Sequence, residues 1–303
     1  MRVRIAIGGD IIFGKGVSRI AQAHGLGYFF EPIAPLLREA DWTVLNMEGC
    51  ISTRGTPLPK EYTFRAPPEL AAHLRLAGVS MVSLGNNHSM DYGAPALLDT
   101  MDYLQRAGIW WSGAGANRAA AAQPVSVDFG GLRVAFVCFT AVVPRGFPAG
   151  MRTPGVATLD TVLPVLQKAR ANADALIVIP HWGDEGSTRP SAKQQRIARQ
   201  LADAGATLIV GHHPHVVQGY AQVGKTHVFY SVGNFIHTPR SRLAQQAVLL
   251  QATLDRSGVC EIQPIPLWLE GGRPIARHSL HPTVRENGVH KKKCGRLARD
   301  RPK

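Results

Sequence analysis

Residues able to bind metal ions recur where predicted β-strands end. They carry carboxylate, amide or imidazole groups and are Asp10, Glu48, Asn87, His181, His213 and His215. In open α/β sheets ligands bind outside the carboxyl ends of the strands, so we expect these side chains to converge on one crevice. An Asp or Asn that follows a strand is, taken alone, more often a turn or helix-cap residue. The joint pattern over five strand ends therefore predicts a metal site.

Two of the imidazoles lie close together in the chain, within the segment Gly211-His212-His213-Pro214-His215. In an extended segment, residues two apart point the same way, so His213 and His215 are expected to reach one ion. The glycine before them and the proline between them indicate a rigid loop that positions both rings.

The mixture of ligand types narrows the choice of metal. Three imidazoles together with carboxylates and an amide oxygen suit manganese, iron or zinc better than magnesium or calcium. No cysteine is a candidate ligand, which argues against a purely structural zinc site. A carboxylate that can bridge, flanked by nitrogen ligands, favours two divalent transition-metal ions roughly 3.5–4 Å apart that activate water.

His88 directly follows a predicted ligand and is expected to lie beside the metals without binding them. A histidine in that place, oriented by Asp91, can act as general acid for the leaving group. The alternative is that His88 only forms hydrogen bonds within its loop.

Alternating strand and helix patterns position these residues. Strands are predicted over 3–7, 42–46, 79–84, 133–139, 175–180, 207–210 and 228–232, and helices over 29–40, 67–78, 94–108, 158–173 and 191–205. Apolar strands separated by helices imply a sheet buried on both faces, which is an α/β layered fold. Residues 246–254 and 259–269, joined by a turn, predict an antiparallel hairpin that completes the sheet.

Composition indicates a globular protein with a basic end. Hydrophobic residues make up 45% of the 303 residues, charged residues 18%, and the net charge is +13. Residues 285–303 hold eight basic and two acidic side chains, so we expect a domain over 1–284 and a disordered basic tail over 285–303. Such a tail can hold nucleic acid or an anionic membrane surface, or it can be a solvated chain end.

The ends of the chain and its cysteines point to the cytoplasm. Residues 1–10 predict a strand, because their apolar stretch is too short for a signal peptide. No run approaches the ~18 apolar residues of a transmembrane segment. The four cysteines are far apart, without a CxxC pair, which favours reduced thiols.

Six short motifs together resemble one known family. They are Gly-Asp at 9–10, Asn-x-Glu at 46–48, Asn-Asn-His-Ser-x-Asp at 86–91, His-Trp-Gly at 181–183, Gly-His-His-Pro-His-Val at 211–216 and Tyr-Ser-Val-Gly-Asn-Phe at 230–235. In order and spacing, residues 5–237 resemble the bacterial capsule-synthesis (CapA/PgsA-type) poly-γ-glutamate proteins, which are related to the calcineurin-like metallophosphoesterases.

The resemblance implies a fold and a set of roles. The fold would be a four-layer α/β/β/α sandwich of the metallo-dependent phosphatase type, with two metals. The six residues named first would be the ligands and His88 the acid, while His212 could exchange roles with one of its neighbours. Arg65 would clamp a substrate anion, and Asn234 would shape the wall of the pocket.

Three functions follow as hypotheses. The first is a metal-dependent hydrolase that acts on a phosphoester or a related anionic substrate, small molecule or polymer, or on an amide. The second is a non-catalytic, metal-stabilised subunit whose partners are poly-γ-glutamate synthesis proteins, because a fold can persist without its chemistry. The third is a nuclease, suggested by the basic tail. No basic stripe with interleaved aromatics occurs before the tail, so nucleic acid is not the expected partner.

Overall fold

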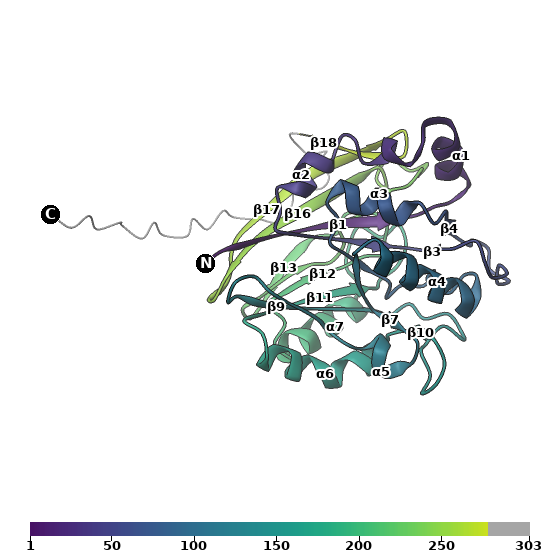
Figure 1. Ribbon diagram of the computed structural model, residues 1–303. Coiled ribbons are helices and arrows are strands. Elements are labelled where there is room, and N and C mark those ends of the chain that lie inside the picture. The colour runs from purple at the N-terminus through teal and green to yellow at the C-terminus, as the bar shows by residue number, and fades with distance from the viewer. Residues whose placement is uncertain (278–303) are drawn as a thin grey trace.

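Two large β-sheets stack face to face within residues 1–277, the part of the chain that the computed structural model describes (Figure 1). The first sheet has the order β18 (Arg273–Ala276), β17 (Gly258–Glu270), β16 (Gln246–Asp255), β1 (Val3–Ile11), β2 (Trp42–Met47), β5 (Met81–Ser83) and β6 (Trp110–Ser112), with β15 (Asn234–Ile236) also paired to β1. The second sheet has the order β13 (Tyr220–Val223), β14 (Thr226–Phe229), β12 (Leu208–Val210), β11 (Ala175–His181), β9 (Arg133–Thr140) and β8 (Val125–Asp128). Short strand pairs link β3 (Cys50–Ile51) to β4 (Arg65–Ala66), and β7 (Ala114–Gly115) to β10 (Gly155–Val156).

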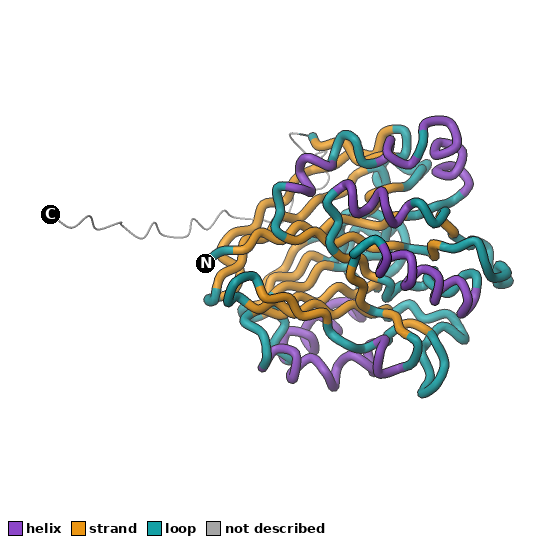
Figure 2. The backbone as a smooth tube through the Cα atoms, in the orientation of Figure 1, coloured by secondary structure: helices purple, strands orange, loops and turns teal. Residues whose placement is uncertain are grey.

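Helices cover the outer face of each sheet (Figure 2). The first sheet packs against α1 (Lys15–His24), α2 (Ala34–Arg38), α3 (Leu70–Ala77) and α4 (Gly93–Arg106), and the 3₁₀ turn η1 (Leu26–Phe29) lies beside them. The second sheet packs against α5 (Arg118–Ala121), α6 (Leu159–Ala171) and α7 (Ala192–Asp203). The resulting order, helix, sheet, sheet, helix, confirms the predicted four-layer α/β/β/α sandwich.

Alternation along the strands divides the core into three apolar layers. In β11, Ile177 and Ile179 face the space between the sheets, whereas Leu176 and Val178 face the outer helices. Successive side chains of a strand point to opposite faces, so a strand apolar throughout is buried on both sides. This is why the run 175–180 carries no polar residue.

Local signals set some helix ends correctly. At the start of α7, Gln194 N donates to Ser191 Oγ at 3.3 Å, and Ser191 N donates to Gln194 Oε1 at 2.9 Å. This reciprocal capping satisfies two backbone donors that the helix leaves free at its first turn. The predicted helix 191–205 is confirmed within a few residues of these bounds.

The predicted helix over 29–40 is wrong. The chain forms η1 and then only the short α2, which has Pro35 in its first turn. Proline lacks an N–H and clashes with the preceding turn, so Pro32 and Pro35 prevent a continuous helix. The sequence reasoning also missed α1, which begins after Gly14.

The last third of the chain agrees with the antiparallel prediction. β16 and β17 pair antiparallel, with Asp255 opposite Gly258 at the turn. The strand predicted over 228–232 ends earlier, at Phe229, and pairs antiparallel with β13 and parallel with β12.

Some predictions concern residues outside the described part of the chain. The predicted boundary at residue 284 and the basic tail 285–303 both lie there, as does Cys294. Cys50 and Cys138 are free, buried cysteines, in line with the predicted reduced thiols. No helix within residues 1–277 is long and apolar enough to cross a lipid bilayer.

Candidate metal centre

The carboxyl ends of strands from both sheets meet at one edge of the sandwich. Asp10 lies in β1, Glu48 follows β2, Asn87 follows β5, His181 ends β11, and His213 and His215 follow β12. β1, β2 and β5 pair parallel, and so do β11 and β12, so their polar ends fall at the same edge of each sheet. The structure therefore brings together all six residues that the sequence predicts as ligands.

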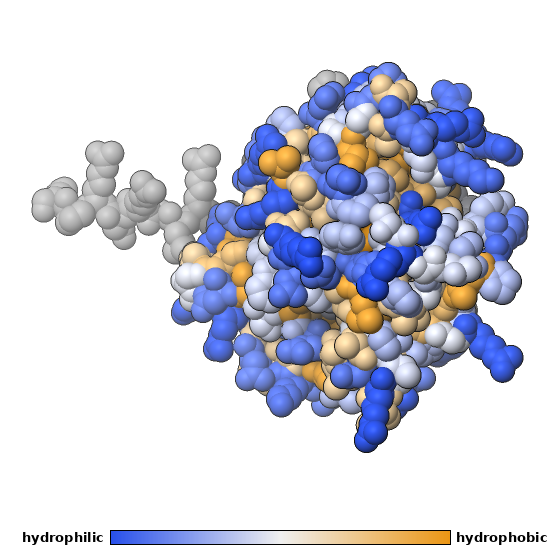
Figure 3. Space-filling model, turned by 45° about the vertical axis from the view of Figure 1, so that its right-hand side comes forward, coloured by the Kyte–Doolittle hydropathy of each residue, from blue (hydrophilic) through white to orange (hydrophobic). Residues whose placement is uncertain are grey.

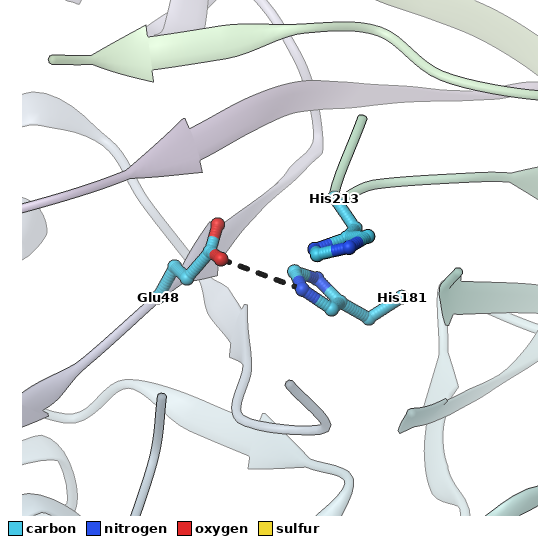
Figure 4. Close-up of side chains that lie close together, drawn as sticks. All are labelled: Glu48, His181 and His213. Atoms are coloured by element: carbon cyan, nitrogen blue, oxygen red, sulfur yellow. Dashed lines mark ion pairs between the residues drawn. The ribbon is translucent and has the colours of Figure 1, made fainter. Parts of the chain in front are cut away.

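Ligand atoms within this set form two groups that share Glu48. Glu48, His181 and His213 form one group, in which one ligand atom from each residue lies within 4.8 Å of the others. Figure 4 shows the carboxylate and the two imidazoles pointing toward one another, with Glu48 Oε1 3.4 Å from His181 Nε2. Asp10, Glu48 and His215 form the second group by the same criterion. A carboxylate common to two groups is the arrangement in which one side chain bridges two ions.

Asn87 adds an amide oxygen to the first group. Its Oδ1 lies 2.8 Å from His181 Nε2, and the residue is buried. The first group therefore offers two imidazoles, a carboxylate and an amide oxygen, whereas the second offers an imidazole and two carboxylates.

The carboxylate of Glu48 is fully buried, and within residues 1–277 neither of its oxygens accepts a hydrogen bond. Burial raises the pKa of Glu48 to about 7. A buried carboxylate without donors is strongly destabilising unless a cation or donor compensates it. The residues present thus fit a bound cation, because it would satisfy oxygens that the described protein leaves unpartnered.

The two histidines of the first group are held in the form that binds metal. Burial lowers the pKa of His213 to about 2 and that of His181 well below its ordinary value. Within the described residues, His213 Nδ1 is buried without a hydrogen-bond partner. Neutral imidazole is the state in which histidine binds a metal, so both rings are ready to do so.

The second group behaves differently because its charges are paired. Burial lowers the pKa of His215, but the charge of Glu48 and the hydrogen bond with Asp10 outweigh it and raise the value to about 9. His215 Nδ1 lies 3.2 Å from Asp10 Oδ2. A metal would replace the proton that His215 shares with these carboxylates.

The loop that carries His213 and His215 is not extended. The two rings therefore do not approach each other through the alternation of an extended segment, as the sequence predicted. Both residues have positive φ, 97° and 58°, in the left-handed region that non-glycine residues rarely adopt. The centres of their rings lie 5.7 Å apart. Each ring belongs to one of the two groups that share Glu48, and both also lie within 4.8 Å of each other in a group with Glu185, so the prediction that they reach one ion stays open. Each such conformation costs about 1–3 kcal/mol and is typical of functional loops.

His212 belongs to neither of the two groups that share Glu48. Its Nε2 lies 2.9 Å from the carbonyl oxygen of Gly8. This geometry favours a supporting role for His212, holding the loop against β1, over an exchange of roles with a neighbouring histidine.

A network of amides holds Asp10 and the end of β2 that precedes Glu48. Asn46 Nδ2 donates to Asp10 Oδ1 at 2.8 Å, and Asn86 Nδ2 donates to Asn46 Oδ1 at 3.2 Å and to the carbonyl oxygen of Met47 at 2.8 Å. Asn46 therefore orients the carboxylate of Asp10, while Glu48, two residues later in the chain, presents a second carboxylate.

Gly9 is required where β15 crosses β1. A Cβ on Gly9 would lie 2.0 Å from the carbonyl oxygen of Gly233. This close approach sets Asn234 opposite Asp10. Asn234 is buried, and its Nδ2 donates to the carbonyl oxygens of His215 and Ala244 at 2.9 and 3.0 Å. The geometry thus supports a role in holding His215, while the contact with substrate stays a prediction.

His88 and Asp91 adopt the arrangement that the sequence predicts. His88 Nδ1 lies 2.6 Å from Asp91 Oδ2, which also accepts a hydrogen bond from Phe64 N at 2.8 Å. The ring of Phe64 lies 4.4 Å from that of His88, centroid to centroid. The imidazole is thereby held from two sides.

Lys60 was not singled out by sequence reasoning. Its Nζ lies 2.6 Å from Asp91 Oδ1, 2.7 Å from the carbonyl oxygen of Asn87 and 3.3 Å from His88 Nδ1. It thus ties the loop before β4 to the loop that presents Asn87 and His88. Only its position in a long Pro-rich loop could have marked it.

Glu185 was likewise not assigned. Its exposed carboxylate can approach His213 and His215 within the same 4.8 Å limit, so it lies at the open side of the centre. Arg65, by contrast, does not join these groups: its guanidinium lies 4.2 Å from the centre of the Tyr92 ring.

Solved structures show the class of fold. A phosphatase from Mycoplasma pneumoniae aligns with a TM-score of 0.60 at 14% identity, over 88% of this chain and 94% of the other. A 5′-nucleotidase precursor from Thermus thermophilus aligns with a TM-score of 0.52 at 15% identity, over 90% of this chain and 56% of the other. The sandwich is therefore of the metallo-dependent phosphatase type, and its clusters of His, Asp and Glu are compatible with metal binding.

Sequence comparison defines the family. The family described as "Bacterial capsule synthesis protein PGA_cap" matches residues 4–239, and the chain belongs to it. The capsule biosynthesis protein CapA of Bacillus anthracis is 32% identical over 276 residues, which cover 88% of this chain and 67% of that protein. The PGA biosynthesis protein CapA of Bacillus subtilis (strain 168) is 30% identical over 279 residues, covering 90% and 73%. The predicted resemblance is confirmed.

Proposed function

We propose that this protein is a metal-dependent hydrolase of the CapA family that acts on a phosphoester or a related anionic substrate. The observation that carries the proposal is the buried carboxylate of Glu48, which accepts no hydrogen bond within residues 1–277 and is common to two groups of ligand atoms. The two groups would hold two divalent ions, manganese, iron or zinc, with Glu48 between them. The phosphatase-type fold supports hydrolysis by analogy, since a fold alone does not define a reaction.

Two divalent ions held by these residues would lower the pKa of a coordinated water and would neutralise charge on substrate oxygens. The protein's own residues fix where this happens, because the asparagines behind Asp10 and the strained histidine loop hold the ligands.

His88 would supply the proton that the leaving group needs. Asp91 and Phe64 hold its ring, and the Nδ1 atom faces Asp91, which leaves Nε2 as the atom that donates to the departing oxygen. Lys60 would hold Asp91 and the backbone of Asn87 in position beside that ring. A positioned acid of this kind contributes roughly 10²–10⁴-fold to rate.

The test combines elemental analysis with two assays. The purified full chain is supplied with manganese, iron or zinc, and hydrolysis of an aryl phosphodiester and an aryl phosphomonoester is measured in parallel. About two ions per chain together with turnover would support the proposal. Absence of bound metal after all three supplies would contradict the centre itself.

The second candidate is a non-catalytic subunit of a polymer-synthesising complex. The names of several relatives favour it, since they describe biosynthesis or, for a Mycobacterium tuberculosis protein 27% identical to this chain, a probable polyglutamine synthesis accessory protein. Tight metal binding, a stable complex with synthesis proteins in a pull-down, and no turnover over a panel of esters and amides would support this candidate against the first.

A further inference from the structure

The side of the metal centre that faces solvent carries a carboxylate to which no role has been assigned. Glu185 is exposed, and one of its carboxylate oxygens lies within 4.8 Å of ring nitrogens of both His213 and His215. Two ligands of one ion, each bonded at about 2.0–2.2 Å, lie at most about 4.4 Å apart. A small movement of this side chain would therefore place the three ligand atoms around one ion.

Backbone hydrogen bonds hold the loop of Glu185 against the loop of the two histidines. Trp182 N donates to the carbonyl oxygen of His212 at 3.0 Å, and Gly186 N donates to that of Pro214 at 2.9 Å. The second bond joins the residue after Glu185 to the residue between the two candidate ligands. The backbone, rather than a chance rotamer of an exposed side chain, therefore brings Glu185 to the histidines.

A buried pair of glutamines fixes the following part of the same loop. Gln218 Nε2 donates to the carbonyl oxygens of Ser187 and Arg189 at 2.8 and 3.2 Å, and Gln218 Oε1 accepts from Gln194 Nε2 at 2.8 Å. Gln218 and Gln194 are only 4% and 1% exposed. Since buried amides are costly when their hydrogen bonds are not made, this pair holds the loop in one position against α7.

Glu185 is not neutralised by a basic side chain. In the part of the chain that the structure describes, no lysine or arginine forms an ion pair with it. Asp91 and Asp99, in contrast, are paired with Lys60 and Arg54. A carboxylate held beside two imidazoles and without such a partner is suited to bind the cation that the imidazoles bind.

The balance of charge favours a third carboxylate at the centre. Of the six candidate ligands, only Asp10 and Glu48 are acidic. Two divalent ions would therefore retain an excess of two positive charges, which Glu185 would reduce to one. The number of charged ligands is one of the features that set the affinity of a metal site.

Exposure distinguishes Glu185 from the ligands in the interior. Asp10, Glu48 and His181 are at most 1% exposed, so they cannot move without disturbing the core. The side chain of Glu185 can turn into water. Figure 3 brings forward the side of the molecule toward which β1 runs in Figure 1, and hydrophilic residues cover much of that surface.

Metal sites that act on substrates keep one position that the substrate can take. We propose that Glu185 is a further ligand of the metal centre, which occupies its solvent-facing side and is displaced there by an anionic substrate. This inference rests on the metal centre of the proposed function and not on its hydrolytic activity.

The first test measures metal affinity without turnover. The affinity of the full chain for Zn²⁺ is measured by competition with a chromophoric chelator in wild type, Glu185→Gln and Asp184→Asn. Asp184 is the neighbouring exposed carboxylate, so its variant is a matched control that removes the same charge. We expect Glu185→Gln to weaken Zn²⁺ binding at least about tenfold, since even residues that only support a ligand cost about 10–100-fold when replaced. The control should change it by less than about twofold, the effect of a screened charge.

Gln218→Met tests how the loop is held. Methionine is similar in size to glutamine but does not donate hydrogen bonds to Ser187 and Arg189, so Glu185 keeps its charge and loses its support. We expect a smaller loss of Zn²⁺ affinity than in Glu185→Gln, and no further loss when Gln218→Met is added to Glu185→Gln. Urea unfolding in chelator establishes that each variant is folded. An equal loss with and without Glu185 would contradict the positioning role.

The second test measures displacement by an anion. Binding of inorganic phosphate to the zinc-loaded protein is followed by isothermal titration calorimetry. Apparent affinity falls in proportion to the fraction of protein whose site is free, so a side chain that occupies the site in about nine of ten molecules weakens binding about tenfold. Phosphate should therefore bind about tenfold more tightly to Glu185→Gln than to Asp184→Asn. Equal phosphate affinities would overturn displacement.

The outcomes separate this inference from the proposed function. Equal Zn²⁺ affinities in Glu185→Gln and Asp184→Asn would overturn the role of Glu185 as a ligand, whereas a wild-type chain that binds no Zn²⁺ would contradict the metal centre itself. Metal affinity that depends on Glu185, in a protein that hydrolyses no ester, would support the inference and contradict the hydrolase. Ester turnover with metal affinity independent of Glu185 would do the reverse.

Discussion

At the scale of single residues, Glu48 carries the most unusual environment in the described structure. Asp10, His181 and His215 form hydrogen bonds, whereas neither oxygen of the buried Glu48 carboxylate accepts one from residues 1–277. In the metal-free protein, the cost of burial without a hydrogen bond therefore falls on the carboxylate that would bridge two ions.

Glu48→Gln should abolish metal binding yet stabilise the metal-free protein. Removing a buried charge that lacks donors is expected to raise the free energy of unfolding in chelator. The gain should be only about 1–2 kcal/mol, because glutamine still buries a polar group. Urea unfolding in chelator and elemental analysis after metal supply measure the two effects. Glu69→Gln, on the exposed side of the start of α3, is the control and should change neither. Metal retained at wild-type stoichiometry in Glu48→Gln would contradict the bridging role.

His88→Ala should act on the leaving group. With poor leaving groups such as alkyl alcohols we expect kcat to fall about 10²–10⁴-fold, because protonation is then required. With a nitrophenolate leaving group, which departs without a proton, the loss should be far smaller while metal content stays unchanged. A loss of the same size for both substrates would count against His88 as the acid.

At the scale of elements, the loop between β3 and β4 is fastened to α4 and thereby holds Lys60, Phe64 and Arg65 in place. Asp99 accepts a hydrogen bond from Ser52 Oγ at 2.6 Å and is paired with Arg54. The hydrogen bond with Arg54 lowers the pKa of Asp99 below its ordinary value of 3.8. Asp99 therefore fastens the start of this loop to α4, while Lys60 and Phe64 further along bind Asp91 directly.

Asp99→Asn should lower stability in a pH-dependent way. A folded-state pKa below the unfolded value means that Asp99 stabilises the fold above about pH 4 and loses this effect as pH falls through the folded value. The difference in urea midpoint between wild type and variant should thus be constant from pH 7 to pH 5 and shrink in more acidic buffer. Asp102→Asn, which removes an exposed partner of Arg106 on the same helix, should show little difference at any pH. A gap that widens with acid would contradict the assignment.

At the scale of the whole molecule, the candidate centre depends on how the two sheets stack. Asp10, Glu48 and Asn87 come from the first sheet, while His181, His213 and His215 come from the second. The apolar layer between the sheets, which includes Ile177, therefore sets the distance between the two halves of the site.

Ile177→Ala and Leu176→Ala separate stability from site geometry. Both side chains are fully buried in β11, but Ile177 faces the other sheet and Leu176 faces the helices. Each variant should lose about 2–5 kcal/mol in the free energy of unfolding. Only Ile177→Ala should also weaken metal affinity, as measured by competition with a chelator under conditions where both variants are folded. Equal metal affinity in the two variants would contradict a dependence on the inter-sheet layer.

Sequence alone determined the residue types of the candidate centre, the strand ends that carry them and the layered class of fold, because residue chemistry and strand periodicity are local properties. It failed over 29–40, where Pro32 and Pro35 override an apolar pattern, and it missed Lys60, whose partners lie about 30 residues along the chain. Only the tertiary structure decided that Glu48 is shared by two groups of ligand atoms, that Glu185 lies near His213 and His215, and that His212 faces Gly8. Those features arise from left-handed backbone in one loop and from the stacking of two sheets, and both depend on contacts between distant segments that no local pattern encodes.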